Sequence, residues 1–234
     1  IGKRIMNNET NKKDLIPKIM KIMNDKKIQD PIKKLLDLEK KFPSDVPLKQ
    51  TISQFYLQKG ENTEALNYMK EALKIEPNNY STHFNLGRVY QKFKKFDEAI
   101  KFYKKSISIN KKFKEGYNIL GDIYFNKKDF NLSVSYYKSS FDLDKTKANL
   151  FAIARLGEGL LNLYLINKDK KLINEAKEHY EFIDLIAPNN LYIKKNLINI
   201  NHYLGLKNEA IILEKKMDGV FIIDKDLDKL LIEY

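Results

Sequence analysis

The chain of 234 residues contains no cysteine and no tryptophan, and it has only 9 glycines and 6 prolines. The absence of cysteine excludes disulfides, thiolate zinc sites and cysteine nucleophiles. The sequence holds no apolar run of the roughly 20 residues that a membrane-spanning helix needs, so we expect no membrane span. Few glycines and prolines are typical of helices that are joined by short turns.

The residue combinations that carry catalysis or bind metals are also missing. The three histidines, His83, His179 and His202, form no HExxH motif and no pair four residues apart. The sequence has no glycine-rich loop that could hold phosphates, and no serine lies in a glycine elbow. We therefore expect a protein that is not an enzyme and that has no catalytic residues, no metal site and no cofactor.

Lysine is abundant, and the formal charge of the chain is +12. The arginines are Arg4, Arg88 and Arg155. Lysine acts as a diffuse point charge, whereas arginine is the side chain that reads phosphates and bases in a bidentate manner. Because the lysines are spread along the chain among many acidic residues, we do not expect nucleic acid to be the partner. RNA binding through the lysine surface stays as the least favoured alternative.

Small and apolar residues recur with a period of 34 residues. The clearest copies are residues 46–79, 80–113 and 114–147. Each copy carries a small residue at positions 8 and 20, where two antiparallel helices would approach each other closely. These small residues are Ser53 and Ala65, Gly87 and Ala99, and Gly121 and Ser133. Apolar residues recur at helical spacing within each half of a copy, which predicts two helices for every 34 residues.

This pattern resembles the tetratricopeptide repeat, whose 34-residue unit carries an L-G-x2-Y…A-x3-F…P pattern. Leu86, Gly87, Tyr90, Ala99 and Tyr103 stand at the corresponding positions of the central copy. The resemblance implies an all-α fold, an α-solenoid of stacked antiparallel helical hairpins that forms a right-handed superhelix. One hairpin cannot bury its apolar faces alone, so stacking of neighbouring hairpins stabilises such a fold.

We expect six repeats in residues 12–217, preceded by a flexible segment at 1–11 and followed by a capping segment at 218–234. The expected repeats are residues 12–45, 46–79, 80–113, 114–147, 150–190 and 191–217. The fifth repeat is 41 residues long, seven more than the unit. Because seven residues make about two helical turns, we expect a longer first helix at about residues 148–166.

The end of the chain carries an apolar stripe that predicts one more helix. Its members recur at helical spacing and are Leu227, Leu230, Leu231 and Tyr234. Such a stripe needs an apolar partner. We expect this segment to cover the apolar side of the last repeat, which would otherwise be exposed.

The resemblance also implies where a ligand would bind. In repeats of this family the first helix of each pair lines the concave face, and positions 2, 5, 6, 9, 12 and 13 point into it. Amides at such positions can donate to and accept from a peptide backbone, and aromatic rings add anchors. The expected peptide-binding residues are Gln50, Gln54, Phe84, Asn85, Arg88, Asn118, Asp122, Lys195 and Asn199. In the fifth repeat the same rule indicates Glu158, Leu161 and Asn162.

These observations predict a non-catalytic scaffold that binds a protein or an extended peptide in its concave groove. An alternative is the recruiting region of a larger enzyme of the glycosyltransferase, sulfotransferase or hydroxylase type, since chains that resemble this one often carry such domains downstream. Any solvated helix face in a protein rich in asparagine and lysine would carry similar residues. The identity of the partner and the oligomeric state do not follow from the sequence, and a cytoplasmic location is favoured.

Overall fold

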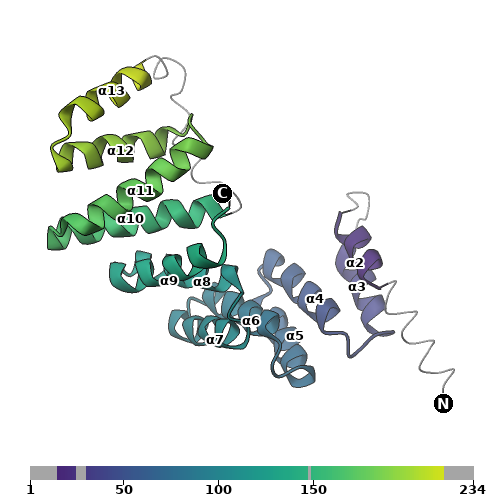
Figure 1. Cartoon of the computed structure of the whole chain (residues 1–234). Helices are drawn as coiled ribbons and strands as arrows, with labels where there is room; N and C mark the ends of the chain where they lie inside the picture. Colours follow the sequence, from purple (N-terminus) through teal and green to yellow (C-terminus); the bar gives the residue numbers. More distant parts are fainter. Residues whose placement is uncertain (1–14, 25–29, 147–148, 219–234) are drawn as a thin grey trace. The chain divides into compact units, whose positions relative to one another are not determined.

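The computed structural model describes residues 15–24, 30–146 and 149–218 (Figure 1). Within these residues it has twelve helices and no strand, so the expected all-α fold of helical hairpins, of the α-solenoid class, is confirmed. The helices are α2 (Leu15–Asn24), α3 (Pro31–Glu39), α4 (Val46–Lys59), α5 (Asn62–Ile75), α6 (Tyr80–Lys92), α7 (Phe96–Ile109), α8 (Lys114–Asn126), α9 (Phe130–Leu143), α10 (Leu150–Asn167), α11 (Lys170–Ile186), α12 (Leu191–Leu204) and α13 (Lys207–Asp218).

The chain divides into two compact units between Phe113 and Lys114. In the first unit α4 pairs with α5 and α6 pairs with α7, and α2 and α3 pack ahead of them. In the second unit the pairs are α8 with α9, α10 with α11 and α12 with α13. Each of the six residue ranges expected to be repeats holds two helices, although α13 extends one residue past the sixth range, to Asp218. The expected C-terminal helix lies outside the described residues.

A tyrosine of the second helix lies directly against the position-8 glycine of the first helix in three hairpins. The pairs are Gly87 with Tyr103, Gly121 with Tyr137 and Gly157 with Tyr180. A Cβ atom placed on Gly87 would lie only 2.5 Å from Cε1 of Tyr103. All three tyrosine side chains are fully buried. Only glycine at position 8 therefore leaves room for the ring.

Where serine replaces glycine at position 8 or alanine at position 20, its hydroxyl forms a hydrogen bond between the two helices of the hairpin. The hydroxyl of Ser53 donates to the backbone carbonyl of Ala65 at 2.8 Å, which joins positions 8 and 20 of one repeat. In the second unit Ser133 at position 20 donates to the carbonyl of Gly121 at 3.0 Å. Both serine side chains are buried, and these bonds satisfy their hydroxyl donors.

The seven extra residues of the fifth repeat are divided between its two helices. Helix α10 has 18 residues and α11 has 17, whereas α4 and α5 have 14 each. The expected lengthening is therefore shared, at about one turn for each helix. Asn149, which precedes α10, is buried and donates to the carbonyls of Ser140 and Asp144 at 3.1 and 2.9 Å. These bonds attach the start of α10 to the end of α9.

A left-handed residue ends the first helix of most hairpins. Gly60 and Gly205 have φ angles of 81° and 77°, and Lys94 and Lys128 adopt the same conformation with φ angles of 59° and 60°. All four stand at position 15 of their repeats. Glycine adopts this conformation without steric cost, whereas a residue with a Cβ atom does not. The turn geometry is thus kept even where the sequence supplies lysine.

Replacing Gly87 by leucine should destabilise the first unit by at least about 3 kcal/mol, the upper end of the usual cost of overpacking. The reason is that the new side chain would compete with the Tyr103 ring for the same space. Urea titration of variant and parent measures the change. The double variant Gly87→Leu, Tyr103→Ala should lose less free energy of unfolding than the sum of the losses of the two single variants. A Gly87→Leu protein that unfolds at the parent's midpoint would show that this contact is not tight.

Replacing Lys94 by glycine should stabilise the protein by up to about 1 kcal/mol. The left-handed conformation costs a residue with a Cβ atom about 1–2 kcal/mol, and the greater freedom of glycine in the unfolded chain offsets part of that gain. The matched control is Lys92→Gly at the end of α6. Because Lys92 has no positive φ angle, this change should lower the stability of the protein. Midpoints of urea unfolding that shift in the same direction for both variants would rule out this explanation.

Candidate functional site

A charged cluster lies on the first helices α8 and α10 of the second unit. The Nη1 atom of Arg155 donates to Oε2 of Glu158 at 2.8 Å, and Nε of Arg155 lies 4.0 Å from Oδ1 of Asp122. The hydroxyl of Tyr137 donates to the same Oδ1 atom. Asp122 and Glu158 stand at position 9 of their repeats and Arg155 at position 6. Both positions belong to the face that the repeat pattern assigns to ligand binding.

Two phenylalanine rings hold the arginine of this cluster. The guanidinium carbon of Arg155 lies 5.1 Å from the ring centroid of Phe125 and 5.4 Å from that of Phe151. At these distances a cation is attracted to the face of an aromatic ring. The Arg155 side chain is nevertheless 35% exposed, so part of the guanidinium faces solvent. The rings and the carboxylates fix its position while leaving it accessible.

Burial controls the protonation behaviour of the cluster. It raises the pKa of Asp122, although the hydrogen bond from Tyr137 and the charge of Arg155 act in the opposite direction. Burial, followed by the charge of Glu158, raises the pKa of Tyr192 to about 12. The phenol of Tyr192 on α12 is therefore a neutral hydrogen-bonding group at physiological pH.

A cleft of about 280 Å³ adjoins the cluster between α10, α11 and α12. Arg155 and Glu158 lie on its lining with Tyr192 and Asn190, and the rest of the lining is apolar. The apolar lining residues are Leu150, Phe151, Ala154, Ile183, Ala187 and Ile193. An apolar hollow with a few polar groups at its edge is the usual form of a small binding site.

The other expected binding residues of the second unit lie on the same helices. Asn118 of α8 is half-buried, and its Oδ1 atom has no hydrogen-bond partner among the described residues. Lys195 and Asn199 of α12 are exposed. The carboxylate of Asp122 is part of the charged cluster described above. The Oδ1 atom of Asn118 is thus a buried acceptor without a partner among the described residues, whereas Oδ1 of Asp122 accepts from Tyr137.

The expected residues of the first unit differ in their surroundings. The Gln50 amide donates to Oγ1 of Thr82 at 2.9 Å, so it joins α4 to α6. The ring of Phe84 packs against Tyr103 and Phe113, at centroid distances of 5.3 and 4.9 Å. These two side chains are thus engaged within the protein. Of the others, Gln54 and Asn85 are half-buried and Arg88 is exposed.

The sequence pattern did not single out Arg155 or Phe151. Both residues stand at binding positions, 6 and 2 respectively, when the fifth repeat is numbered from Leu150. Applying the position rule to the whole of α10 would have found them, because Leu156 and Gly157 fix the numbering. The contact of Arg155 with Phe125 of the preceding repeat has no signal in the sequence.

The described part of the chain gives no support for a metal centre or a membrane span. No group of three or more histidine, aspartate or glutamate side chains in that part could hold a metal ion. None of the described helices combines the length and the apolar character needed to cross a bilayer.

Comparison with known sequences identifies the repeat. Residues 56–130 and residues 115–147 each match a family described as tetratricopeptide repeat. No curated protein sequence matches the chain.

Solved structures of similar fold were also found. A MamA structure has a TM-score of 0.61 and 23% identity, and the match covers 73% of this chain and 88% of that one. YrrB, described as a TPR protein with an unusual peptide-binding site, has a TM-score of 0.63 and 16% identity, with coverage of 79% and 91%. MamA from Desulfovibrio magneticus RS-1 has a TM-score of 0.61 and 17% identity, with coverage of 77% and 97%. These likenesses concern the fold.

The raised pKa of Asp122 makes a pH-dependent prediction. The folded protein binds a proton at Asp122 more readily than the unfolded chain does, so acidification stabilises the folded state between the raised pKa and the ordinary value of 3.8. We expect the free energy of unfolding of the parent, relative to that of Asp122→Asn at the same pH, to increase as the pH falls from neutral through this range. Paired urea titrations measure the difference, and a decrease would mean that the contacts with Arg155 and Tyr137 outweigh burial.

Proposed function

Because the chain is a tetratricopeptide-repeat protein, we propose that it is a non-catalytic scaffold that binds an extended peptide on the face formed by α8, α10 and α12. The observation that carries this proposal is the fixed but accessible guanidinium of Arg155 beside an apolar cleft. This face offers hydrogen-bonding groups and an apolar hollow, which suit the binding of a peptide.

The chemistry of this face suits an extended backbone. A peptide presents one N–H donor and one carbonyl acceptor for every residue other than proline. Arg155 would donate to a carbonyl oxygen, since its guanidinium has five N–H groups and hydrogen-bonds to Glu158 through Nη1. The buried Oδ1 atom of Asn118 would accept from a backbone N–H or a side chain that reaches it. Leaving such an acceptor unpaired has a cost in free energy, so a ligand that satisfies it would gain affinity.

The cleft would supply selectivity for one side chain. Its volume of about 280 Å³ and its apolar lining suit an aliphatic or aromatic residue of the peptide. Leu150, Ala154 and Ile193 would contact that side chain, and the ring of Phe151 would cover it. Arg155 and Glu158, at the edge of the cleft, would bind the backbone on either side.

The expected residues of the first unit are proposed as a separate peptide-contacting surface within that unit. Arg88 is exposed, and Gln54 and Asn85 are half-buried, so their polar groups would be available to a ligand. Gln50 and Phe84 would contribute indirectly by fixing the neighbouring helices. The same face would serve in a free scaffold or in the recruiting region of a larger enzyme.

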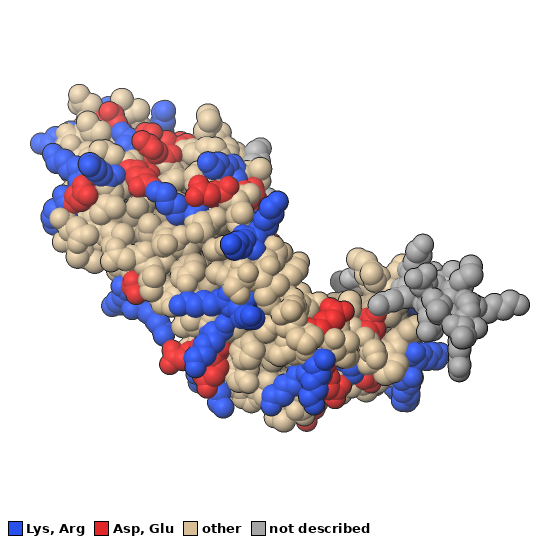
Figure 2. All heavy atoms as spheres, turned by 60° about the horizontal axis from the view of Figure 1, so that its bottom comes forward, with Lys and Arg blue, Asp and Glu red and all other residues tan. Residues whose placement is uncertain are grey.

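The structural neighbours support the scaffold class. YrrB, with 16% identity, is described as having a peptide-binding site, which fits the use of this fold as a support for peptide recognition. Nucleic acid has less support, because Lys and Arg are interspersed with Asp and Glu on the face that Figure 2 shows. A phosphate backbone is usually bound by a continuous basic stripe.

Truncating Arg155 to alanine should weaken peptide binding strongly. Peptides selected from a random library against the full chain serve as probes, and titration calorimetry measures their affinity. Loss of one anchoring residue commonly costs about 2 kcal/mol, which is roughly thirtyfold in affinity. The matched control is Lys138→Ala, which breaks an exposed ion pair of 2.8 Å with Glu175 between α9 and α11 and should leave affinity unchanged.

A second variant separates binding from folding. Ala154→Leu fills part of the cleft without removing any charge, so it should also weaken binding while the melting temperature stays close to that of the parent. If the selected peptides bind the Arg155→Ala and Ala154→Leu proteins as tightly as the parent, this face is not the binding site.

A further inference from the structure

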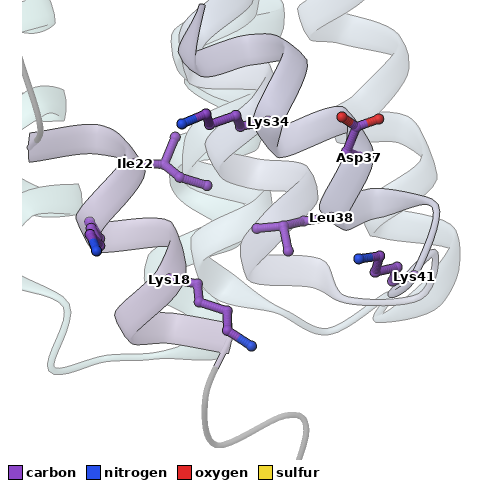
Figure 3. A pocket seen from close by; sticks show the side chains of 7 residues that line it. Lys18, Ile22, Lys34, Asp37, Leu38 and Lys41 are labelled. Atoms are coloured by element: carbon purple, nitrogen blue, oxygen red, sulfur yellow. The ribbon is translucent and has the colours of Figure 1, made fainter. Parts of the chain in front are cut away.

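A second hollow lies in the first unit between α2 and α3, with a volume of about 450 Å³. Figure 3 shows Ile22 of α2 and Leu38 of α3 at the gap between the two helices, with lysine side chains around them. Both apolar side chains are half-buried, so part of each faces the hollow. The lysines that line the hollow are Lys18, Lys21, Lys34 and Lys41.

Four lysine residues thus line one hollow, and none of them forms an ion pair with another described residue. Among the described residues that line the hollow, Asp37 supplies the carboxylate. It forms an ion pair of 3.0 Å with Lys40, which does not line the hollow. The ion pairs formed between described residues include none of the four lysines. Like charges that share one hollow repel each other, and an anionic occupant would relieve the repulsion.

Helix dipoles do not account for this arrangement. A cation is favoured near the C-terminus of a helix and disfavoured near the N-terminus. Lys21 and Lys41 lie near the C-terminal ends of α2 and α3, where a cation is expected. Lys34 is the fourth residue of α3, whose N-cap is Asp30, so it lies near the N-terminus of the helix, where a cation is disfavoured. The placement of Lys34 therefore has an electrostatic cost that a bound anion would offset.

We propose that this hollow binds an acidic peptide segment of a partner protein, in which carboxylates flank an apolar side chain. Lysine ammonium groups attract carboxylates as point charges, and Ile22 and Leu38 offer an aliphatic contact between them. The residues described as lining the hollow include no arginine for bidentate phosphate binding and no aromatic ring for base stacking. This composition favours an acidic peptide over a nucleic acid.

This site is separate from the proposed peptide-binding face on α8, α10 and α12. The hollow belongs to the first unit and that face to the second, and they share no residue. A variant of the lysines leaves Arg155 and its cleft unchanged, so the two proposals can fail independently.

The test uses the full chain and two labelled peptides of equal length. One is Glu-Asp-Leu-Asp-Glu, and the other is Gln-Asn-Leu-Asn-Gln, in which amides replace the carboxylates. Fluorescence anisotropy measures binding to the parent, to the triple variant Lys18→Gln, Lys34→Gln, Lys41→Gln, and to a control. The control is Lys70→Gln, Lys74→Gln, Lys101→Gln, which removes the same charge from exposed positions of α5 and α7.

We expect the acidic peptide to bind the parent, and to bind the hollow variant at least about tenfold more weakly, the sum of three modest charge contacts. The control variant should stay within about twofold of the parent. Circular dichroism identifies any variant that has lost its fold, and in that case the single changes Lys18→Gln and Lys34→Gln replace the triple one.

Three results would overturn the proposal. An equal loss of affinity for the acidic peptide in the hollow variant and in the control variant would mean that the net charge of the protein alone attracts the peptide. Equal binding of the amide peptide would mean that the carboxylates are not recognised. Tighter binding of an oligouridylate RNA, lost in the same hollow variant, would assign the site to nucleic acid instead.

Discussion

The contact on which the rest of the structure depends is the tyrosine ring that lies against a glycine of the paired helix. The ring packs the two helices of a hairpin together. In two hairpins its hydroxyl also donates a hydrogen bond to a side chain of the first helix. The hydroxyl of Tyr103 donates to Gln91 at 2.8 Å, and the hydroxyl of Tyr137 donates to Asp122. Because the ring is buried in the core, the side chain that its hydroxyl contacts on the first helix is held as well. In the second unit this contact couples core packing to Asp122 of the proposed binding face.

The fold could be predicted from the sequence because the close approach of two helices demands small residues at regular positions. Gly87 and Ala99 carry that signal in one repeat, and the same spacing recurs along the chain. In the fifth repeat the sequence predicted a first helix at about residues 148–166, close to the observed α10 at Leu150–Asn167. The lengthening of the second helix α11 was not predicted, because its extra turn carries no signal that distinguishes it from the rest of the helix.

The candidate site could be predicted in direction but not in detail. A repeat position tells which way a side chain points, whereas its partners come from neighbouring helices. Phe84 packs on Phe113, and the Gln50 amide donates to Thr82, and neither contact follows from the repeat position. The position rule can indicate Arg155, but its contacts with Phe125 and Asp122, which fix the guanidinium, come from the structure alone. The lysines of α2 and α3 likewise look ordinary until the hollow between the helices is known.

The most direct test of the central claim, that the first helices of the second unit carry the peptide-binding face, is mapping of a bound peptide by NMR. Amide chemical shifts of the labelled full chain are followed while a library-selected peptide is added. The account predicts that the largest changes fall on α8, α10 and α12, around Asn118, Asp122, Arg155 and Tyr192. Changes confined to the second helices α9 and α11, with those four residues unaffected, would contradict it.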